Sequence, residues 1–402
     1  MITSFEIKNY LSFAERSTVD LAVGVSAPDN YHFLDNVCSR NRVAKILGFY
    51  GANASGKTNL LRVLSALADF ISDSFSYKLD DSTPFRSHFF HATEPVGVHI
   101  EFVVNDHATG KPNCYRYDLE IAEQSVRYER LRIKSSKLFS RVFERQWVDG
   151  QYQVQGLGGK HAANLRKNVS WLAWLAQHNL PEAVSIVQYF KQFRSNLTPR
   201  GPRMPGLYNT IDAIDTFRNN PALSQSMVAQ LNRWDIDIQD MVYERIDGAG
   251  AGAGDPASTG NWMAYCIHQM ADQSARLSIL NESSGTVGLF SLLSTVLPVL
   301  NDGGVAIIDE LEADLHPHML EAVIDLFVQP ATNPNGAQLL FTSHADWLMN
   351  LLHKTQIYLV DKLDASSEVI RLSEMRGVAA RENFSARYRA GAYGAVPDIQ
   401  QS

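Results

Sequence analysis

Residues 51–58 read Gly-Ala-Asn-Ala-Ser-Gly-Lys-Thr and carry the clearest chemistry in the sequence. They fit the pattern G-x-x-x-x-G-K-[ST], called Walker A, at every fixed position. Its glycines let the backbone turn so that successive N–H groups point at phosphate oxygens, and the start of a following helix adds partial positive charge. We expect Lys57 to reach the β- and γ-phosphates of a nucleotide and Thr58 to ligate Mg²⁺. The residues expected to contact the nucleotide here are Gly51, Asn53, Ala54, Ser55, Gly56, Lys57, Thr58 and Asn59.

Two adjacent carboxylates, Asp309 and Glu310, follow the apolar run Val305–Ile308 in the pattern called Walker B. Asp309 is predicted to hold Mg²⁺ directly or through water. Glu310 lies one residue further on, where it would polarise an attacking water as a general base. Acidic residues also favour the start of a helix, so the pair alone would fit either interpretation. The Walker A loop upstream favours the catalytic one.

These side chains need a scaffold that brings them to one place, and the apolar pattern predicts one. A strand at 45–50 leads into the Walker A loop, and a helix at 59–72 follows it. From residue 274 onward, strands at 305–308, 338–342 and 356–360 alternate with helices at 285–300, 317–327 and 345–352. Such alternation is typical of a parallel sheet covered on both faces, with ligands beyond the carboxyl ends of its strands. We therefore expect Gly51, Asp309 and Ser343 at one sheet edge.

The remaining segments suggest a three-part organisation. Strands are predicted at 96–105, 115–121, 128–134 and 146–154. Helices are predicted at 164–177, 182–193, 211–217 and 224–234, and the proline-rich segment 199–206 interrupts them. We interpret residues 1–155 as the first part of a nucleotide-binding head, 156–245 as an inserted helical lobe and 246–402 as the rest of the head. The glycine-rich segment 247–254 fits a hairpin tip or linker.

Composition narrows the class of protein. The 402 residues are 45% hydrophobic, with a formal net charge of −7. This balance argues against a general nucleic-acid coat but leaves room for a local basic groove.

The three cysteines, Cys38, Cys114 and Cys266, have no metal-binding spacing, and their odd number argues against a disulfide framework. The longest apolar run, 287–300, is too short to span a bilayer. We expect a soluble, cytoplasmic protein without membrane contact.

The ordered motifs resemble those of ABC-type ATPases of the SMC/Rad50/OLD branch, in particular the small prokaryotic AAA15 and AAA21 ATPases. Residues 281–286, Asn-Glu-Ser-Ser-Gly-Thr, resemble the signature segment at a helix start. Residues 312–317, Glu-Ala-Asp-Leu-His-Pro, resemble the D-loop, and 342–344, Thr-Ser-His, resemble the switch histidine. The tail at 388–397 resembles the ending of this subfamily. The resemblance covers roughly 1–125 and 270–400.

This resemblance implies an ABC-ATPase head: an α/β fold with a parallel-sheet P-loop core, an antiparallel β subdomain and an inserted helical lobe. It implies hydrolysis of ATP to ADP and phosphate, with Mg²⁺. Two heads would pair head-to-tail and trap ATP, so that Ser284 and Gly285 contact the γ-phosphate from the partner subunit and His344 reports its loss. The implied catalytic residues are Glu310, His344 and Lys57, and the implied metal ligands are Thr58 and Asp309.

Two departures from the family pattern stand out. The signature contains Ser-Ser-Gly-Thr where Ser-Gly-Gly is common. No glutamine-centred Q-loop is evident, and Arg86, in the segment 83–86, occupies about the expected place.

The resemblance implies a role in prokaryotic phage defence or abortive infection. Such ATPases act as homodimers or higher homo-oligomers with a separately encoded effector, often a nuclease.

A competing hypothesis is a DNA-repair or recombination ATPase that clamps DNA directly, because basic residues crowd one predicted β-rich stretch. That stretch would otherwise be a solvated sheet face. Its basic residues are Arg127, Arg130, Arg132, Lys134, Lys137, Arg141 and Arg145. A transporter-associated ATPase fits the inserted lobe and the C-terminal motif poorly, and a GTPase would need an N-K-x-D motif that the sequence lacks.

Overall fold

The computed structural model describes residues 1–24, 27–28, 30, 32–39, 41–106, 109–134, 137–159, 165–199, 207–246, 262–313 and 315–396. Four predicted features therefore lie wholly or partly outside the described residues. They are the glycine-rich segment 247–254, most of the proline-rich segment 199–206, Asp314 of the D-loop and Pro397 of the tail.

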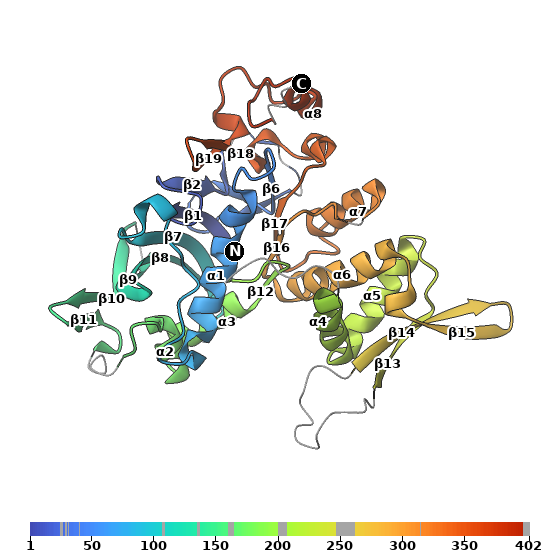
Figure 1. The fold of residues 1–402 in the computed structure, drawn as a ribbon, viewed down its shortest axis with the longest axis horizontal. Helices are drawn as coiled ribbons and strands as arrows, with labels where there is room; N and C mark the ends of the chain where they lie inside the picture. The colour runs from blue at the N-terminus through green and yellow to red at the C-terminus, as the bar shows by residue number, and fades with distance from the viewer. Residues whose placement is uncertain are drawn as a thin grey trace.

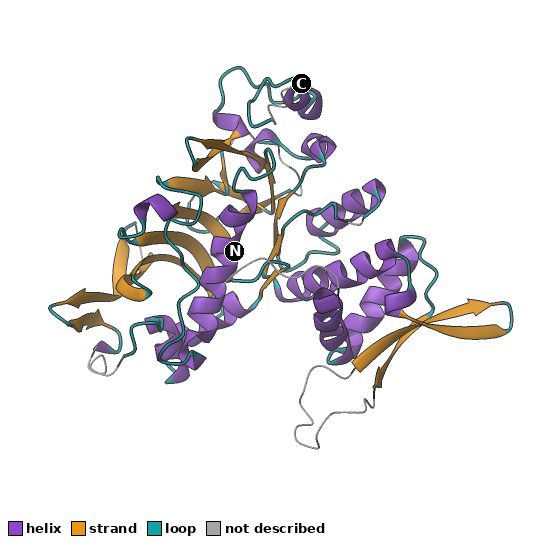
Figure 2. Ribbon diagram, in the orientation of Figure 1, coloured by secondary structure: helices purple, strands orange, loops and turns teal. Residues whose placement is uncertain are grey.

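A six-stranded sheet forms the centre of the molecule (Figure 2). Its strand order is β12 (Phe193–Ser195), β16 (Val305–Ile308), β17 (Gln338–Thr342), β6 (Ile46–Tyr50), β18 (Ile357–Leu363) and β19 (Ser366–Arg371). The first five strands run parallel, and β19 is antiparallel to β18. Strands β6, β16 and β17 are buried at every residue, as their unbroken apolar runs predict.

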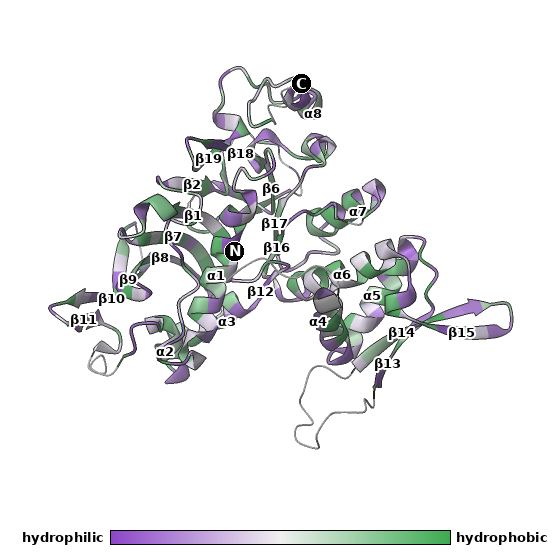
Figure 3. Ribbon diagram, viewed as in Figure 1, coloured by the Kyte–Doolittle hydropathy of each residue, from purple (hydrophilic) through white to green (hydrophobic). Residues whose placement is uncertain are grey.

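Helices cover both faces of this sheet, and alternate strand residues face the two sides. Leu47 and Ile307 belong to the core that contains α1 (Lys57–Asp73), whereas Ile46 and Ile308 belong to the core that contains α6 (Ser284–Asp302) and α7 (Pro317–Val328). Figure 3 shows the hydrophobic residues concentrated along these central strands and the helices beside them. The predicted α/β fold is confirmed.

A seven-stranded antiparallel sheet packs on the α1 side and forms the predicted β subdomain. Its strands, in spatial order, are β11 (Gln151–Gly156), β10 (Phe139–Val148), β9 (Ser125–Lys134), β8 (Pro112–Ala122), β7 (Val96–Asn105), β1 (Ile2–Lys8) and β2 (Ser17–Asp20). A small sheet of β3 (Ala22–Val23), β5 (Arg42–Ala44) and β4 (Phe33–Asp35) precedes β6.

The helices between 156 and 245 separate into two groups. Helices α2 (Trp171–Gln177) and α3 (Pro181–Lys191) pack against α1, whereas α4 (Leu207–Arg218) and α5 (Pro221–Arg233) pack against α6. Strand β12 joins the central sheet between them. The division at 155/156 and 245/246 stays a prediction.

A fourth sheet packs beside α4 and α5, with strands β13 (Asp240–Arg245), β14 (Trp262–Met270) and β15 (Gln273–Ser278). The β14–β15 hairpin projects away from the body of the molecule (Figure 1). Beyond β17, the predicted helix at 345–352 is a 3₁₀ helix, η5 (Asp346–Leu351), on which α8 (Phe384–Arg389) packs. Among the described helices, α6 is long and apolar enough to cross a membrane by length and composition, and nine of its residues are buried in the core.

The inference against a disulfide is wrong for one pair of cysteines. Cys38 and Cys114 form a disulfide with a Cα–Cα separation of 5.9 Å, and Cys266 is free and buried. The two bonded cysteines are 76 positions apart. The count and the linear spacing of cysteines could not show that β8 passes beside the turn after β4.

Candidate nucleotide site

The Walker A loop leaves the carboxyl end of β6 and turns sharply into α1. Gly51 has a φ of 157°, and a Cβ there would collide with the backbone carbonyl of Val360. Gly56 has a φ of 111°, and a Cβ there would collide with the side chains of Ser12 and Ser367. Both glycines are therefore needed for the turn, because L side chains rarely adopt these φ values and no space remains for one.

Lys57 lies buried under this loop, where its Nζ donates hydrogen bonds of 2.9 Å to the carbonyls of Gly51 and Ala52. Burial lowers the pKa of Lys57, although the carboxylates of Asp309, Glu312 and Glu310 oppose the shift. Beside it, the buried Oγ of Ser55 has no hydrogen-bond partner among the residues that the structure describes. A buried cation and an unpaired hydroxyl in one turn fit an anionic ligand such as a nucleotide phosphate.

Asp309 follows β16 and meets two threonine hydroxyls. Thr58 at the start of α1 donates to Asp309 with its Oγ1 2.9 Å from Oδ2, and Thr342 at the end of β17 donates to Oδ1 over 2.7 Å. Three elements thus bring hydroxyl and carboxylate oxygens together, which are ligands that Mg²⁺ prefers. Thr58 and Asp309, the predicted metal ligands, lie together here and would hold the ion, and Thr342 is an addition from the structure; their metal-binding role stays a prediction.

Glu310 turns out of the sheet edge. Its φ is +51°, its backbone N–H donates to Thr342 Oγ1 over 2.8 Å, and its side chain is exposed. The backbone N–H of Leu311 donates to the carbonyl of Thr342, so one residue holds the whole turn. The Glu310 carboxylate is therefore exposed just beyond the end of β16 and close enough to Lys57 to oppose the lowering of its pKa, a position that suits a general base.

Asn196 is a site residue that the sequence did not reveal. It follows β12, the parallel neighbour of β16, and its side chain makes two hydrogen bonds of 2.8 Å with the backbone of Asp309. Arg86, the residue considered for the Q-loop, is exposed, and its carbonyl accepts a hydrogen bond from the N–H of Leu11, next to Ser12; its role stays a prediction. Residue 193 was assigned to the end of a helix, which concealed the three-residue strand before Asn196.

His344 lies exposed after β17, at the same edge as Asp309. Its backbone N–H donates to Oε1 of Glu312 over 2.6 Å, whereas Oε2 of Glu312 is buried and has no partner within the described ranges of the chain. The expected D-loop and switch segments are therefore in direct contact. Their nucleotide-sensing role stays a prediction.

The signature segment forms the start of α6 and lies apart from the Walker A loop. Ser283 caps the helix by accepting a hydrogen bond from the backbone N–H of Thr286 over 3.1 Å. Ser284 is exposed at the first turn, beside the half-buried Gly285. Within the described part of the chain, no hydrogen bond joins either residue to the Walker A loop. Residues that contact a nucleotide held by a second copy must lie away from the Walker A loop of their own chain, as these residues do.

The basic stretch on β9 and β10 is largely neutralised. Arg130 and Arg132 pair with Asp118 at 3.1 and 3.0 Å, and Arg145 pairs with Glu129 at 2.9 Å with both side chains fully buried. Arg127 pairs with Glu123, and Lys134 donates to the Cys38 carbonyl. In the described part of the chain, Lys137 and Arg141 remain exposed without an ion pair.

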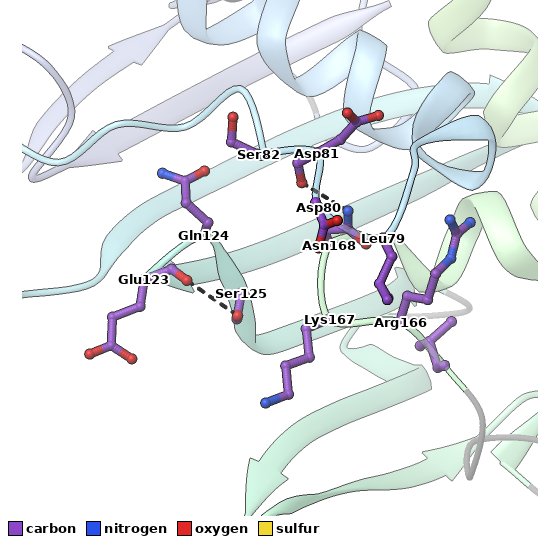
Figure 4. A pocket seen from close by; sticks show the side chains of 11 residues that line it. Leu79, Asp80, Asp81, Ser82, Glu123, Gln124, Ser125, Arg166, Lys167 and Asn168 are labelled. Carbon is purple, nitrogen blue, oxygen red and sulfur yellow. Dashed lines mark hydrogen bonds between the residues drawn. The ribbon is translucent and has the colours of Figure 1, made fainter.

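A separate pocket of about 590 Å³ lies beyond the end of α1 (Figure 4). Asp80, Asp81 and Glu123 line it together with Arg166 and Lys167, and none of its lining residues belongs to the Walker A loop. The Arg166 guanidinium already donates to the carbonyls of Phe75 and Tyr77. This mixture of charges selects no class of ligand.

A family model described as "AAA domain, putative AbiEii toxin, Type IV TA system" matches residues 46–350. Comparison with curated protein sequences gives no match. Among solved structures, the chain is similar to an SMC head bound to the C-winged helix domain of ScpA, with 14% identity and a TM-score of 0.45 over 92% of this chain and 96% of that chain. It is also similar to the SMC head domain from Thermotoga maritima, with 10% identity and a TM-score of 0.41 over 92% and 98%.

Proposed function

We propose that this chain, which belongs to the family described as AAA domain, putative AbiEii toxin, Type IV TA system, dimerises on ATP and regulates a separately encoded effector in prokaryotic antiviral defence. The chain is an ATPase, and its family implies nucleotide binding. The observation that carries the proposed site is the hydrogen-bonded cluster of Thr58, Asp309 and Thr342 beside Lys57. The defence role and the effector, a nuclease in our proposal, rest on the family description and the motif resemblance.

In the proposed reaction, the backbone N–H groups of residues 51–58 and the Lys57 ammonium bind the phosphates. Mg²⁺, held by Thr58 and Asp309, would neutralise charge on the β- and γ-phosphates. Glu310 orients the attacking water and accepts its proton. His344 contacts the γ-phosphate end and links its presence to Glu312.

ATP binding and dimerisation are coupled in this proposal. The exposed Ser284 and Gly285 at the start of α6 contact the γ-phosphate held by a second copy. ATP then favours the closed dimer because it bridges both surfaces, and hydrolysis releases it. A cytoplasmic location completes the proposal.

Direct DNA clamping is the second candidate, and the ion pairs argue against the surface that suggested it. A phosphate-binding face needs several unpaired cations that can displace counterions. Most of the arginines on β9 and β10 instead pair with carboxylates, and Arg145 is fully buried.

The test uses tagged Glu310→Gln protein expressed from its native operon and purified with ATP. Loss of the general base should slow hydrolysis by about 100-fold or more while ATP binding persists, so a bound effector should co-purify in stoichiometric amount. The matched control is Lys57→Ala, which removes the phosphate-binding cation and should lose both nucleotide and effector. ATP binding without any protein partner would contradict the regulatory role, and co-purifying DNA that dissociates with rising salt would favour the clamp.

A further inference from the structure

Several large apolar side chains are exposed along the described chain, and two groups of them flank the proposed nucleotide site and the signature segment. Phe89 and Phe90 in η2 (Phe89–His91) are 66% and 69% exposed, with ring centroids 4.1 Å apart. We call them the aromatic patch. Met270, Leu277 and Leu280 are 75%, 38% and 43% exposed around the β14–β15 hairpin, and we call them the hairpin patch. The two phenylalanine rings are in contact, and Met270 and Leu277 lie on one face of the hairpin, opposite Gln273 and Cys266. Exposed apolar groups that share a face are candidates for an interaction surface.

Hydrogen bonds hold the aromatic patch close to the Walker A loop, with one short segment of the chain between them. The backbone N–H of His88 donates to Asn9 Oδ1 over 3.0 Å, and His88 Nε2 lies 3.2 Å from the carbonyl of Ala365. The segment that begins at Asn9 continues to Ser12, whose Oγ accepts a hydrogen bond from Asn59 Nδ2 in α1 over 3.0 Å. The patch is therefore a rigid neighbour of the proposed nucleotide site.

Strand pairing and a hydrogen bond likewise hold the hairpin patch beside the signature segment. Leu277 pairs across the sheet with Cys266, two residues before His268 on the same face of β14. His268 Nε2 lies 2.7 Å from Oε1 of Glu282, which directly precedes the Ser283 cap of α6. Figure 3 shows that the hairpin is otherwise largely hydrophilic, so its apolar side chains are exceptions on a polar arm.

We propose that the aromatic patch of one protomer packs against the hairpin patch of a second copy of this chain when ATP joins the two heads. The inference rests on the proposed function, because head-to-tail pairing is what sets a Walker A loop opposite a signature segment. One patch flanks each of these two elements, so the same pairing sets the patches opposite each other. In a two-fold dimer this contact forms twice.

The contact has a clear physical benefit for the dimer. It removes five apolar side chains from water at each of two places, and aromatic residues and Met are enriched at such interface cores. The hairpin also carries the His268–Glu282 contact, so a second copy that binds the hairpin acts on the segment before Ser284.

The first test is a complementation experiment in the Glu310→Gln background. The variants are Phe89→Ser with Phe90→Ser, and Met270→Ser with Leu277→Ser. Each should raise the Kd of the ATP-dependent dimer at least about tenfold in analytical ultracentrifugation, because both copies of the contact are lost. A mixture of the two variants restores one complete contact, so its dimer should be tighter than either variant alone. Leu138→Ser, which removes a side chain 77% exposed elsewhere, should change nothing.

A photo-crosslinker placed at Phe90 gives a second readout that does not depend on weakened dimers. It should crosslink, only with ATP, to a peptide within 267–280 of another copy. Dimers that form with crosslinks elsewhere, or a mixture no tighter than the average of the two variants, would overturn the inference alone. Glu310→Gln protein that binds ATP but never dimerises would overturn the proposed function together with the inference.

Discussion

At the residue scale, the candidate site depends on how firmly Asp309 is held. Thr58 and Thr342 bind its carboxylate, and Asn196 binds its backbone N–H and carbonyl. The backbone contacts fix where the strand β16 ends, and the hydroxyl contacts fix where the carboxylate points. Because both the backbone and the carboxylate of Asp309 are held by hydrogen bonds, its side chain already occupies one rotamer before the ion binds. A metal ligand of this kind loses little conformational entropy on binding.

Asn196→Ala should therefore lower activity without unfolding the protein. Removal of both hydrogen bonds frees the backbone of Asp309, and supporting residues of this kind usually contribute about 10–100-fold to activity or metal affinity. We expect a kcat lower by that factor and a higher Mg²⁺ concentration for half-maximal rate. Asn113→Ala, whose side chain contacts only Tyr115 at 3.4 Å among the described residues, is the matched control. An Asn196→Ala enzyme with the original Mg²⁺ dependence would contradict this role.

The sequence revealed those residues of the candidate site that lie close together in one short segment of the chain. The Walker A loop and the pair Asp309–Glu310 are of this kind, because a strand, a turn and a functional side chain follow one another directly. Asn196 and Thr342 act through their neighbours in the sheet, and strand order is not written in local spacing. Asn196 is separated from Asp309 by more than a hundred positions and touches it only because β12 lies beside β16.

At the element scale, the same contrast holds for secondary structure. The long helices α1, α6 and α7 were predicted nearly to their ends because their apolar faces repeat regularly. Helix α2 was predicted from residue 164 but begins at Trp171, where the carboxylate of Glu129 accepts hydrogen bonds of 2.9 Å from the Trp171 N–H. Ser170 also caps this helix by accepting a hydrogen bond from the Leu172 N–H over 3.1 Å, so the helix start is set by a local cap that the prediction overlooked and by a carboxylate from the distant strand β9.

The hairpin and the signature segment are linked by a titratable contact. The hydrogen bond that His268 donates to the Glu282 carboxylate raises the pKa of His268, with a further contribution from the carbonyl of Asp237. A raised folded-state pKa means that the contact stabilises the fold fully below the ordinary histidine pKa of about 6.5. This stabilisation is lost as pH rises through the higher folded-state value.

We therefore expect the difference in unfolding free energy between wild type and His268→Gln to be largest in acid and to shrink above neutral pH. Urea unfolding across pH 5–9 measures it. His318→Gln, which changes another exposed histidine, controls for the general loss of a histidine. A difference that grew with pH would mean that the neutral form of His268 makes the contact.

Three elements meet at a buried ion pair on the other side of the molecule. Glu129 of β9 and Arg145 of β10 are both fully buried and 2.9 Å apart, and Glu129 also accepts hydrogen bonds from Tyr117 and Ser170. Arg145 donates to the carbonyl of Val169 over 2.9 Å, just before α2. The pair thus fastens α2 to the antiparallel sheet.

Arg145→Met should destabilise the protein by about 3–5 kcal/mol, because it leaves the charge of Glu129 buried without compensation. The double variant Glu129→Gln with Arg145→Met should be more stable than Arg145→Met alone, since no isolated charge remains. Denaturant unfolding of the two variants measures this difference. If the double variant were the less stable of the two, the capping of α2 by the ionised carboxylate would outweigh the charge imbalance.

At the scale of the whole molecule, the two ends of the sequence build one head. The backbone N–H of Ile2 donates to Oε1 of Gln338 over 2.6 Å, and Gln338 Nε2 donates back to the carbonyl of Ile2 over 3.0 Å. Tyr358 likewise bonds to the backbone of Asp20. These contacts join β1 and β2 to the central sheet, so they fasten the antiparallel subdomain to the nucleotide-binding sheet.

The disulfide adds a covalent constraint to this arrangement, since the loop that Cys38 and Cys114 close contains the Walker A loop, α1 and β7. Closing a loop of this length restricts the unfolded chain, and such bonds typically contribute about 2–4 kcal/mol. Cys114→Ser should therefore lower the unfolding free energy by about that amount, and a reductant should do the same to wild type but not to the variant. Cys266→Ser, which removes the free thiol, should keep its sensitivity to the reductant.

The redox state of Cys38 and Cys114 in cells tests the proposed location, because a reducing cytosol keeps thiols free. Mass spectrometry after rapid alkylation of cells should then find Cys38 and Cys114 alkylated, and the protein would operate at its reduced-state stability. Cysteines found bonded in cells would contradict a reducing cytosol as its site of action.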